Sequence, residues 1–136
     1  MSQAYFIYAE DDPDAVFLVR AALRKLNAED RLVHCSDGDA LICFLRDSII
    51  SGSLPTFVLL DLRMPKMGGF DALRWIRSTK ALKTLPVIIL SSSFLPQDIE
   101  LATVLGATNY LMKPGSYGEL CAQLSELLAR FGLKNT

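Results

Sequence analysis

Residues 57–73, FVLLDLRMPKMGGFDAL, contain a complete strand-to-helix unit. The run from 56 to 61 is apolar without alternation, as expected of a strand that is covered on both faces in a parallel sheet. It ends at Asp61, and the glycine pair at 68–69 precedes a helical pattern. An acid directly after FVLL is costly to bury unless another group balances its charge. The stretch therefore predicts a strand, a loop and a helix, with a carboxylate at the carboxyl end of the strand.

Similar units lie on both sides of this one. Further strands are expected at residues 4–9, 31–35, 86–91 and 108–112. Helices are expected after Asp12, after Asp37, after Gly69, from 96 to about 105, and across the apolar periodicity between 120 and 131. Asp12 can cap the first helix with Pro13 at its first position, and Gly106 can close the fourth. The alternation of strands and helices predicts an α/β protein.

Five such units in 136 residues indicate one domain with a doubly wound parallel sheet and helices on both faces. The expected topology is flavodoxin-like, with five strands in the order 2-1-3-4-5 and five helices. In sheets of this kind, functional groups gather beyond the carboxyl ends of the strands, at the switch point between the first and third strands. The residues that directly follow the strands are therefore the candidates for a site.

The composition limits the possible functions. Hydrophobic residues make up 51% of the chain and charged residues 21%, and the net charge of -1 provides no general attraction to nucleic acid or an anionic membrane. No apolar stretch is long enough to span a bilayer, and the N-terminus lacks a signal-peptide pattern, so the expected location is the cytoplasm. The three cysteines lack metal-binding spacing, and we expect them to be reduced packing residues. His34, the only histidine, is a poor candidate for a metal ligand or a catalytic base.

Polar side chains follow four of the expected strands: Glu10, Asp11, Asp61, Ser91 and Lys113. Three carboxylates at one sheet edge repel one another unless a proton or a cation relieves the repulsion. Mg²⁺ suits a site that offers a few carboxylates and leaves room for water and a phosphoryl oxygen. A lysine can pair with a carboxylate and later with a phosphoryl oxygen, to which a serine hydroxyl can also donate. The set is suited to accepting a phosphoryl group on an aspartate.

Four motifs together resemble a known family. YAEDDPD (8–14), FVLLDLRMPKMGGFDAL (57–73), LPVIILSSS (85–93) and GATNYLMKP (106–114) are similar in order and spacing to the CheY-like receiver domain of two-component response regulators. The resemblance covers residues 4–130 as a receiver domain. Residues 131–136 are expected to form a short C-terminal tail, with no output domain attached.

The resemblance implies a role for each site residue. Asp61 would be the phosphoacceptor, and Glu10 and Asp11 would hold Mg²⁺ together with Asp61. The backbone carbonyl of Arg63 would be a further metal ligand.

The same resemblance assigns the residues that sense the phosphoryl group. Ser91 would be the switch hydroxyl, Lys113 the family lysine, and Tyr110 the aromatic residue that changes rotamer on activation. The peptide bond between Lys113 and Pro114 is expected to be cis.

The resemblance also implies partners. The phosphodonor would be a histidine on a sensor kinase or a phosphotransfer protein, and RDSIISGSLPTF (46–57) resembles partners of phytochrome-type kinases. The readout would be a downstream protein target or a homodimer, bound through the surface of the fourth helix, fifth strand and fifth helix. Such a chain is a signalling phosphoacceptor that assists its own phosphorylation and dephosphorylation, and is not an enzyme in the usual sense.

Three positions depart from the family pattern. Glu10 replaces a commoner aspartate, and its longer side chain can reach a metal through water. Gly68 stands where many relatives have aspartate, and Gly115 where a bulky apolar residue is frequent. None of these changes removes a reacting group.

Three other functions share part of this pattern. A haloacid-dehalogenase-type phosphatase needs a second acid two residues after the nucleophile, where this chain has Arg63. A nucleotide or flavin binder needs an uncharged phosphate loop after the first strand, where EDDPD would repel phosphate. The remaining alternative is a receiver-like interaction module that is not phosphorylated.

Overall fold

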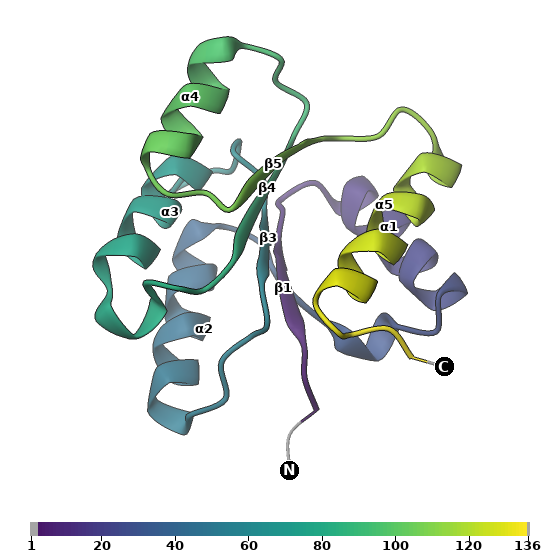
Figure 1. Cartoon of the computed structure of the whole chain (residues 1–136), viewed down its shortest axis with the longest axis horizontal. Helices are drawn as coiled ribbons and strands as arrows, with labels where there is room; N and C mark the ends of the chain where they lie inside the picture. The colour runs from purple at the N-terminus through teal and green to yellow at the C-terminus, as the bar shows by residue number, and fades with distance from the viewer. Residues whose placement is uncertain (1–2, 136) are drawn as a thin grey trace.

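The computed structural model describes residues 3–135 and has a five-stranded parallel sheet in the order β2-β1-β3-β4-β5. The strands are β1 Phe6–Ala9, β2 Leu32–Cys35, β3 Val58–Leu60, β4 Val87–Ser91 and β5 Asn109–Met112. The helices are α1 Pro13–Lys25, α2 Gly38–Ser51, α3 Gly69–Ser78, α4 Pro96–Val104 and α5 Tyr117–Arg130. The expected flavodoxin-like, doubly wound fold is confirmed (Figure 1). Two short 3-10 turns, Glu29–Arg31 and Lys80–Leu82, had no counterpart among the expected elements.

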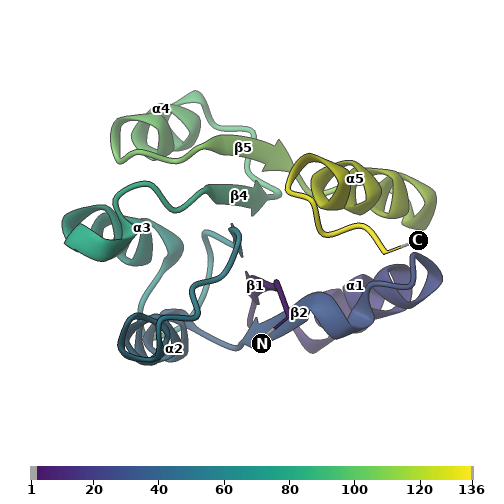
Figure 2. The same ribbon diagram turned by 60° about the horizontal axis from the view of Figure 1, so that its bottom comes forward.

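The helices divide between the two faces of the sheet. Helices α1 and α5 cover one face, and α2, α3 and α4 cover the other (Figure 2). Alternate residues of β1 serve the two cores, with Phe6 and Tyr8 facing α1 and α5 and with Ile7 and Ala9 facing the opposite helices. Strand β1 is fully buried on both faces, and Glu10, which directly follows it, is buried too. The Glu10 carboxylate therefore lies inside the protein at the end of the strand and not in solvent.

Capping residues define the ends of the helices and thereby the lengths of the loops that connect them to the strands. The Asp12 carboxylate accepts a hydrogen bond from the Asp14 amide at 3.0 Å, and Pro13 opens α1 as expected. The Asp37 carboxylate caps α2 by accepting from the amide of Ala40 at 2.7 Å. Gly106, with φ 97°, follows α4 in the left-handed conformation that glycine favours.

The segment after Arg130 is part of the folded core. Leu133 is fully buried against the α1 and α5 side of the sheet. The Asn135 side chain accepts from the Arg31 guanidinium at 2.6 Å and donates to the backbone carbonyl of Asn27 at 2.6 Å. These hydrogen bonds hold the end of the described chain at the side of the molecule opposite the carboxyl ends of the strands (Figure 1). None of the described helices combines the length and hydropathy needed to cross a bilayer.

Candidate functional site

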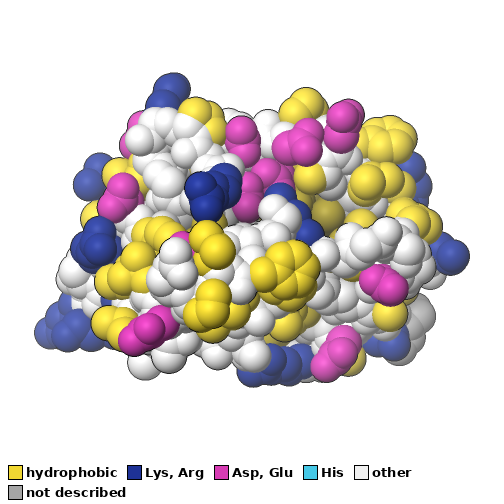
Figure 3. All heavy atoms as spheres, turned by 90° about the horizontal axis from the view of Figure 1, so that it is seen from above, with side chains coloured by type: hydrophobic (Ala, Val, Ile, Leu, Met, Phe, Trp, Pro, Cys, Tyr) yellow, Lys and Arg dark blue, Asp and Glu magenta, His cyan; other side chains and the backbone are white. Residues whose placement is uncertain are grey.

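The strand register brings the candidate residues together. Ala9 of β1 lies opposite Leu60 of β3, so Glu10 and Asp61 leave neighbouring strands at the same level. The Lys113 amide donates to the Ser91 carbonyl at 2.8 Å, which places the ends of β4 and β5 side by side. Seen from this end, acidic side chains gather at the centre of the surface, with basic and hydrophobic side chains around them (Figure 3).

Three carboxylates form one cluster. Glu10, Asp11 and Asp61 each offer an oxygen, and these oxygens lie within 4.8 Å of one another. Glu10 and Asp61 are buried, whereas Asp11 is exposed. Because all three donors are hard oxygens and one side is open to water, the set fits a divalent cation such as Mg²⁺.

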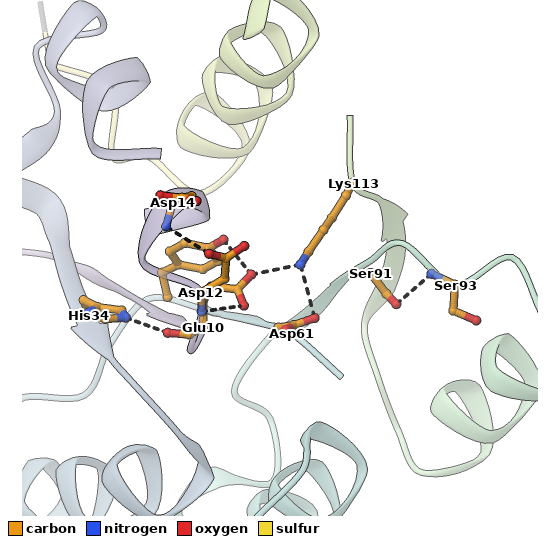
Figure 4. Close-up of polar contacts among 9 residues, drawn as sticks. Glu10, Asp12, Asp14, His34, Asp61, Ser91, Ser93 and Lys113 are labelled. Atoms are coloured by element: carbon orange, nitrogen blue, oxygen red, sulfur yellow. Dashed lines mark hydrogen bonds and ion pairs between the residues drawn. The ribbon is translucent and has the colours of Figure 1, made fainter. Parts of the chain in front are cut away.

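Lys113 bridges two of the carboxylates. Its Nζ lies 2.9 Å from Oε1 of Glu10 and 3.5 Å from Oδ1 of Asp61, so the ammonium joins the ends of β1, β3 and β5 (Figure 4). This is the pairing expected of a lysine that balances a carboxylate before a phosphoryl group arrives.

Glu10 is held more firmly than the sequence suggested. Its Oε1 also accepts from the Tyr8 hydroxyl at 3.2 Å, and its Oε2 accepts from the Asp12 amide at 3.3 Å. The sequence reasoning missed Tyr8, although a residue two before Glu10 on the same strand shares its face of the sheet. On the other side, the ring of His34 donates from Nε2 to the Glu10 carbonyl at 2.7 Å and so fixes the backbone there.

The surroundings of Asp61 make it bind a proton more tightly than an ordinary aspartate when no metal is bound. Burial raises the pKa of Asp61 to about 7, and a hydrogen bond with Glu10 and the Glu10 charge add to that effect. Burial also acts to raise the pKa of Glu10, but hydrogen bonds from Asp61 and Lys113 outweigh it and lower that pKa. Burial opposes the charge of Lys113, yet the hydrogen bond to Glu10 and the charge of Asp61 raise its pKa. A metal ion or an approaching cation would therefore convert Asp61 to the reactive carboxylate.

The predicted switch residues Ser91 and Tyr110 meet at the loop after β4. Ser91 is buried, and its Oγ accepts from the Ser93 amide at 3.1 Å, so the hydroxyl lies toward Ser93 (Figure 4). The Tyr110 hydroxyl, half-buried, donates to the Ser93 carbonyl at 3.2 Å. Ser91 and Tyr110 are thus joined through one residue, Ser93.

Two further expectations concern the loops that border the site. The peptide between Lys113 and Pro114 was expected to be cis, and it is trans, the isomer that X-Pro bonds favour in the absence of contacts specific for cis. The Arg63 side chain is exposed and lies 3.6 Å from Asp98, whereas the metal-ligating role of its carbonyl remains a prediction.

The glycines near the site differ in how much space they leave for a side chain. A Cβ on Gly69 would lie 2.5 Å from the Asp61 carbonyl oxygen and 2.7 Å from the Leu62 Cα. A Cβ on Gly68 would meet only the Leu62 carbonyl, at 3.5 Å. A Cβ on Gly115 would meet only Oε2 of Glu119, at 3.9 Å, and a cavity of about 240 Å³ lies beside this glycine between α1 and α5. The requirement for glycine therefore falls on Gly69, where α3 begins against the backbone of Asp61 and Leu62.

Gly69→Ala is expected to lower the free energy of unfolding by about 1–3 kcal/mol, because its methyl group would push the Asp61 and Leu62 backbone. It should also slow any chemistry at Asp61. The matched variant Gly68→Ala, whose methyl has room, should change stability by less than about 0.5 kcal/mol. Urea unfolding of both variants tests this, and equal losses would contradict the close packing at Gly69.

Comparisons with known proteins agree with this geometry. The family profile of the response regulator receiver domain matches residues 6–125. The two-component response regulator ORR41 of Oryza sativa subsp. japonica is 31% identical over 127 residues, which cover 93% of each chain. The Mn²⁺-bound form of response regulator Rcp1 superposes with a TM-score of 0.82 at 26% identity, covering 98% of this chain and 97% of that one. The phosphorylated cyanobacterial phytochrome response regulator RcpA superposes with a TM-score of 0.84 at 27% identity, covering 98% of each chain.

Proposed function

Because the chain belongs to the receiver domain family of response regulators, we propose that Asp61 accepts a phosphoryl group from a partner histidine kinase or phosphotransfer protein in an Mg²⁺-dependent reaction. The observation that carries the proposal is the cluster of Glu10, Asp11 and Asp61 with the Lys113 ammonium across it. The chain acts as a signalling phosphoacceptor, and it assists the transfer through these residues.

Each site residue has a distinct task. An Asp61 oxygen attacks the phosphorus in line, an O–P bond forms, and the bond to the donor imidazole breaks with its electron pair remaining on that nitrogen. Glu10, Asp11, Asp61 and the Arg63 carbonyl would hold Mg²⁺, with Glu10 able to reach the ion through water. The ion would offset charge on the transferring group. The structural similarity to response regulator Rcp1, which has been crystallised in an Mn²⁺-bound form, supports a divalent ion in this chain.

Lys113 changes partners during the reaction. In the unphosphorylated chain it pairs with Glu10 and Asp61, and afterwards its ammonium pairs with a phosphoryl oxygen. Glu10 stays in place through Tyr8 and the Asp12 amide, so it remains an anchor for the lysine.

Phosphorylation then changes the surface of α4, β5 and α5. Ser91 turns its hydroxyl from the Ser93 amide to the phosphoryl group, the loop after β4 shifts, and Tyr110 follows it by a rotamer change. This surface carries exposed apolar side chains around α4, including Phe94 and Val104, which suit a protein partner or a second copy.

We also propose a phosphodonor, a location and a readout for the chain. The similarity to RcpA supports a kinase of the phytochrome type as phosphodonor. We propose that the chain works in the cytoplasm, where its readout is the binding of a downstream protein or homodimerisation, without nucleic acid or membrane contact.

Incubation with acetyl phosphate and Mg²⁺, followed by intact mass measurement, tests the function. We expect one phosphoryl group on the wild-type chain and none when a chelator removes the metal. An unmodified chain with acetyl phosphate and with other small phosphodonors would favour the non-phosphorylated interaction module instead.

A further inference from the structure

A chain of polar contacts runs from the loop after Asp61 to the switch serine. Arg63 NH2 lies 3.6 Å from Oδ2 of Asp98, at the start of α4. The same Oδ2 accepts a hydrogen bond from the Ser93 hydroxyl at 2.6 Å. The Ser93 amide in turn donates to Oγ of Ser91 at 3.1 Å. The predicted phosphoacceptor loop and the switch hydroxyl are therefore joined through Asp98.

Ser93 is the most connected residue of the loop after β4. Besides its contacts with Ser91 and Asp98, its hydroxyl accepts from the Leu95 amide at 3.2 Å and its carbonyl accepts from Tyr110. Ser93 cannot shift without disturbing all of these contacts. The contact with Asp98 is the strongest of them, because it is short, charged and mostly shielded, the Asp98 side chain being 16% exposed.

The contact between Ser93 and Asp98 affects how easily the Ser91 hydroxyl can reorient. With Ser93 held by Asp98, the Ser93 amide keeps the Ser91 hydroxyl turned toward it. Figure 4 shows the Ser91 hydroxyl lying toward Ser93 and away from Asp61, so it has to turn before it can donate to a phosphoryl oxygen on Asp61. That turn carries Oγ away from the Ser93 amide unless the loop moves with it. The free energy of the Asp98 contact therefore opposes activation.

We propose that Asp98 is a positioning residue, a latch that holds the loop after β4 through Ser93 in its unphosphorylated arrangement, with Arg63 orienting the carboxylate. The inference rests on the proposed phosphorylation of Asp61. Releasing the latch makes the activated arrangement more accessible, so the unphosphorylated chain is easier to phosphorylate. Asp98 acts through Ser93 and does not touch the reacting atoms.

The test compares Asp98→Ala with Asp71→Ala. Asp71 is a closely matched control, because it lies at the same position in the first turn of α3 and pairs with Arg74 at 3.0 Å. Both variants lose one negative charge near a helix N-terminus, but only Asp98 contacts the loop after β4. We expect Asp98→Ala to be phosphorylated by acetyl phosphate about two- to tenfold faster than wild type, and Asp71→Ala at the wild-type rate.

A second readout does not depend on phosphorylation. Hydrogen exchange measured by NMR on the unphosphorylated chain should show the amides of Ser93 and Leu95 exchanging about two- to tenfold faster in Asp98→Ala than in Asp71→Ala. Ser93→Ala, which removes the hydroxyl but keeps the helix acid, should raise the phosphorylation rate in the same direction as Asp98→Ala.

The outcomes separate the latch from the function. A wild-type chain that takes up no phosphoryl group refutes the proposed function, and the amide exchange still tests the latch. If wild type is phosphorylated but Asp98→Ala reacts no faster than Asp71→Ala, the latch is refuted. Faster amide exchange without a faster reaction also refutes it, because the loop would then move without affecting the switch.

Discussion

Asp61→Asn should take up no phosphoryl group from acetyl phosphate and Mg²⁺, while folding at least as stably as wild type. The amide lacks the nucleophilic oxygen, so no O–P bond can form. It can still donate to Glu10 without adding a second buried negative charge. We therefore expect a gain in unfolding free energy of about 0.5–2 kcal/mol at about pH 8, as is common when a strained functional group is neutralised.

The stability gain should depend on pH in a defined direction. In metal-free buffer, the pKa of Asp61 is about 7 in the folded chain, whereas the usual pKa of an aspartate is 3.8. The folded state therefore binds this proton more tightly, and the stability it contributes is full below 3.8 and is lost as the pH rises through 7. The difference between Asp61→Asn and wild type should accordingly grow between these two values. Urea unfolding across this range measures it.

Asp39→Asn is the control for the loss of reaction. Asp39 lies exposed in the first turn of α2 and is not a member of the carboxylate cluster, so its variant should be phosphorylated like wild type. A phosphoryl adduct on Asp61→Asn at the wild-type level would place the phosphoacceptor elsewhere. A constant stability difference across the pH range would contradict the raised pKa of Asp61.

The position of the site could be predicted because it depends on local sequence patterns, namely where apolar runs end and where helices are capped. Apolar runs that stop at Glu10, Asp61, Ser91 and Lys113 mark strand ends, and parallel strands place their ends on one edge of the sheet. The caps at Asp12 and Asp37 follow from the same local rules. None of these inferences requires knowledge of a side-chain rotamer.

The hydrogen bonds and ion pairs of the site could not be predicted, because they depend on loop conformations and side-chain rotamers. That Lys113 bonds Glu10 more closely than Asp61 depends on the reach of a glutamate anchored by Tyr8. The contact between Ser93 and Asp98 depends on the path of the loop after β4, which carries no periodic pattern. Sequence spacing shows which residues are near one another, whereas these contacts are decided by tertiary packing.

Lys113→Ala is expected to lower the free energy of unfolding by about 2–4 kcal/mol at about pH 8 without metal. The ammonium is the cation that the structure places between Glu10 and Asp61, and both carboxylates are buried. Removing it leaves two negative charges facing each other in a poorly solvated site. Urea unfolding measures the loss, and Mg²⁺ should restore part of it, because the ion binds the folded chain and supplies the missing charge.

Lys66→Ala is the matched control for this loss. Lys66 also pairs with a carboxylate, Asp37 at 3.8 Å, but its side chain is 69% exposed, so its variant should lose less than about 1 kcal/mol. The loss from Lys113→Ala should shrink as the pH falls, because Asp61 then takes up its proton and only Glu10 keeps a charge. The Lys113 charge lowers the pKa of Asp61, so in this variant the proton is taken up at a higher pH than in wild type. Glu10→Gln added to Lys113→Ala should recover stability for the same reason. If the two lysine variants lost equal stability, or if the double variant recovered none, Lys113 would not be the counterion that allows these carboxylates to be buried together.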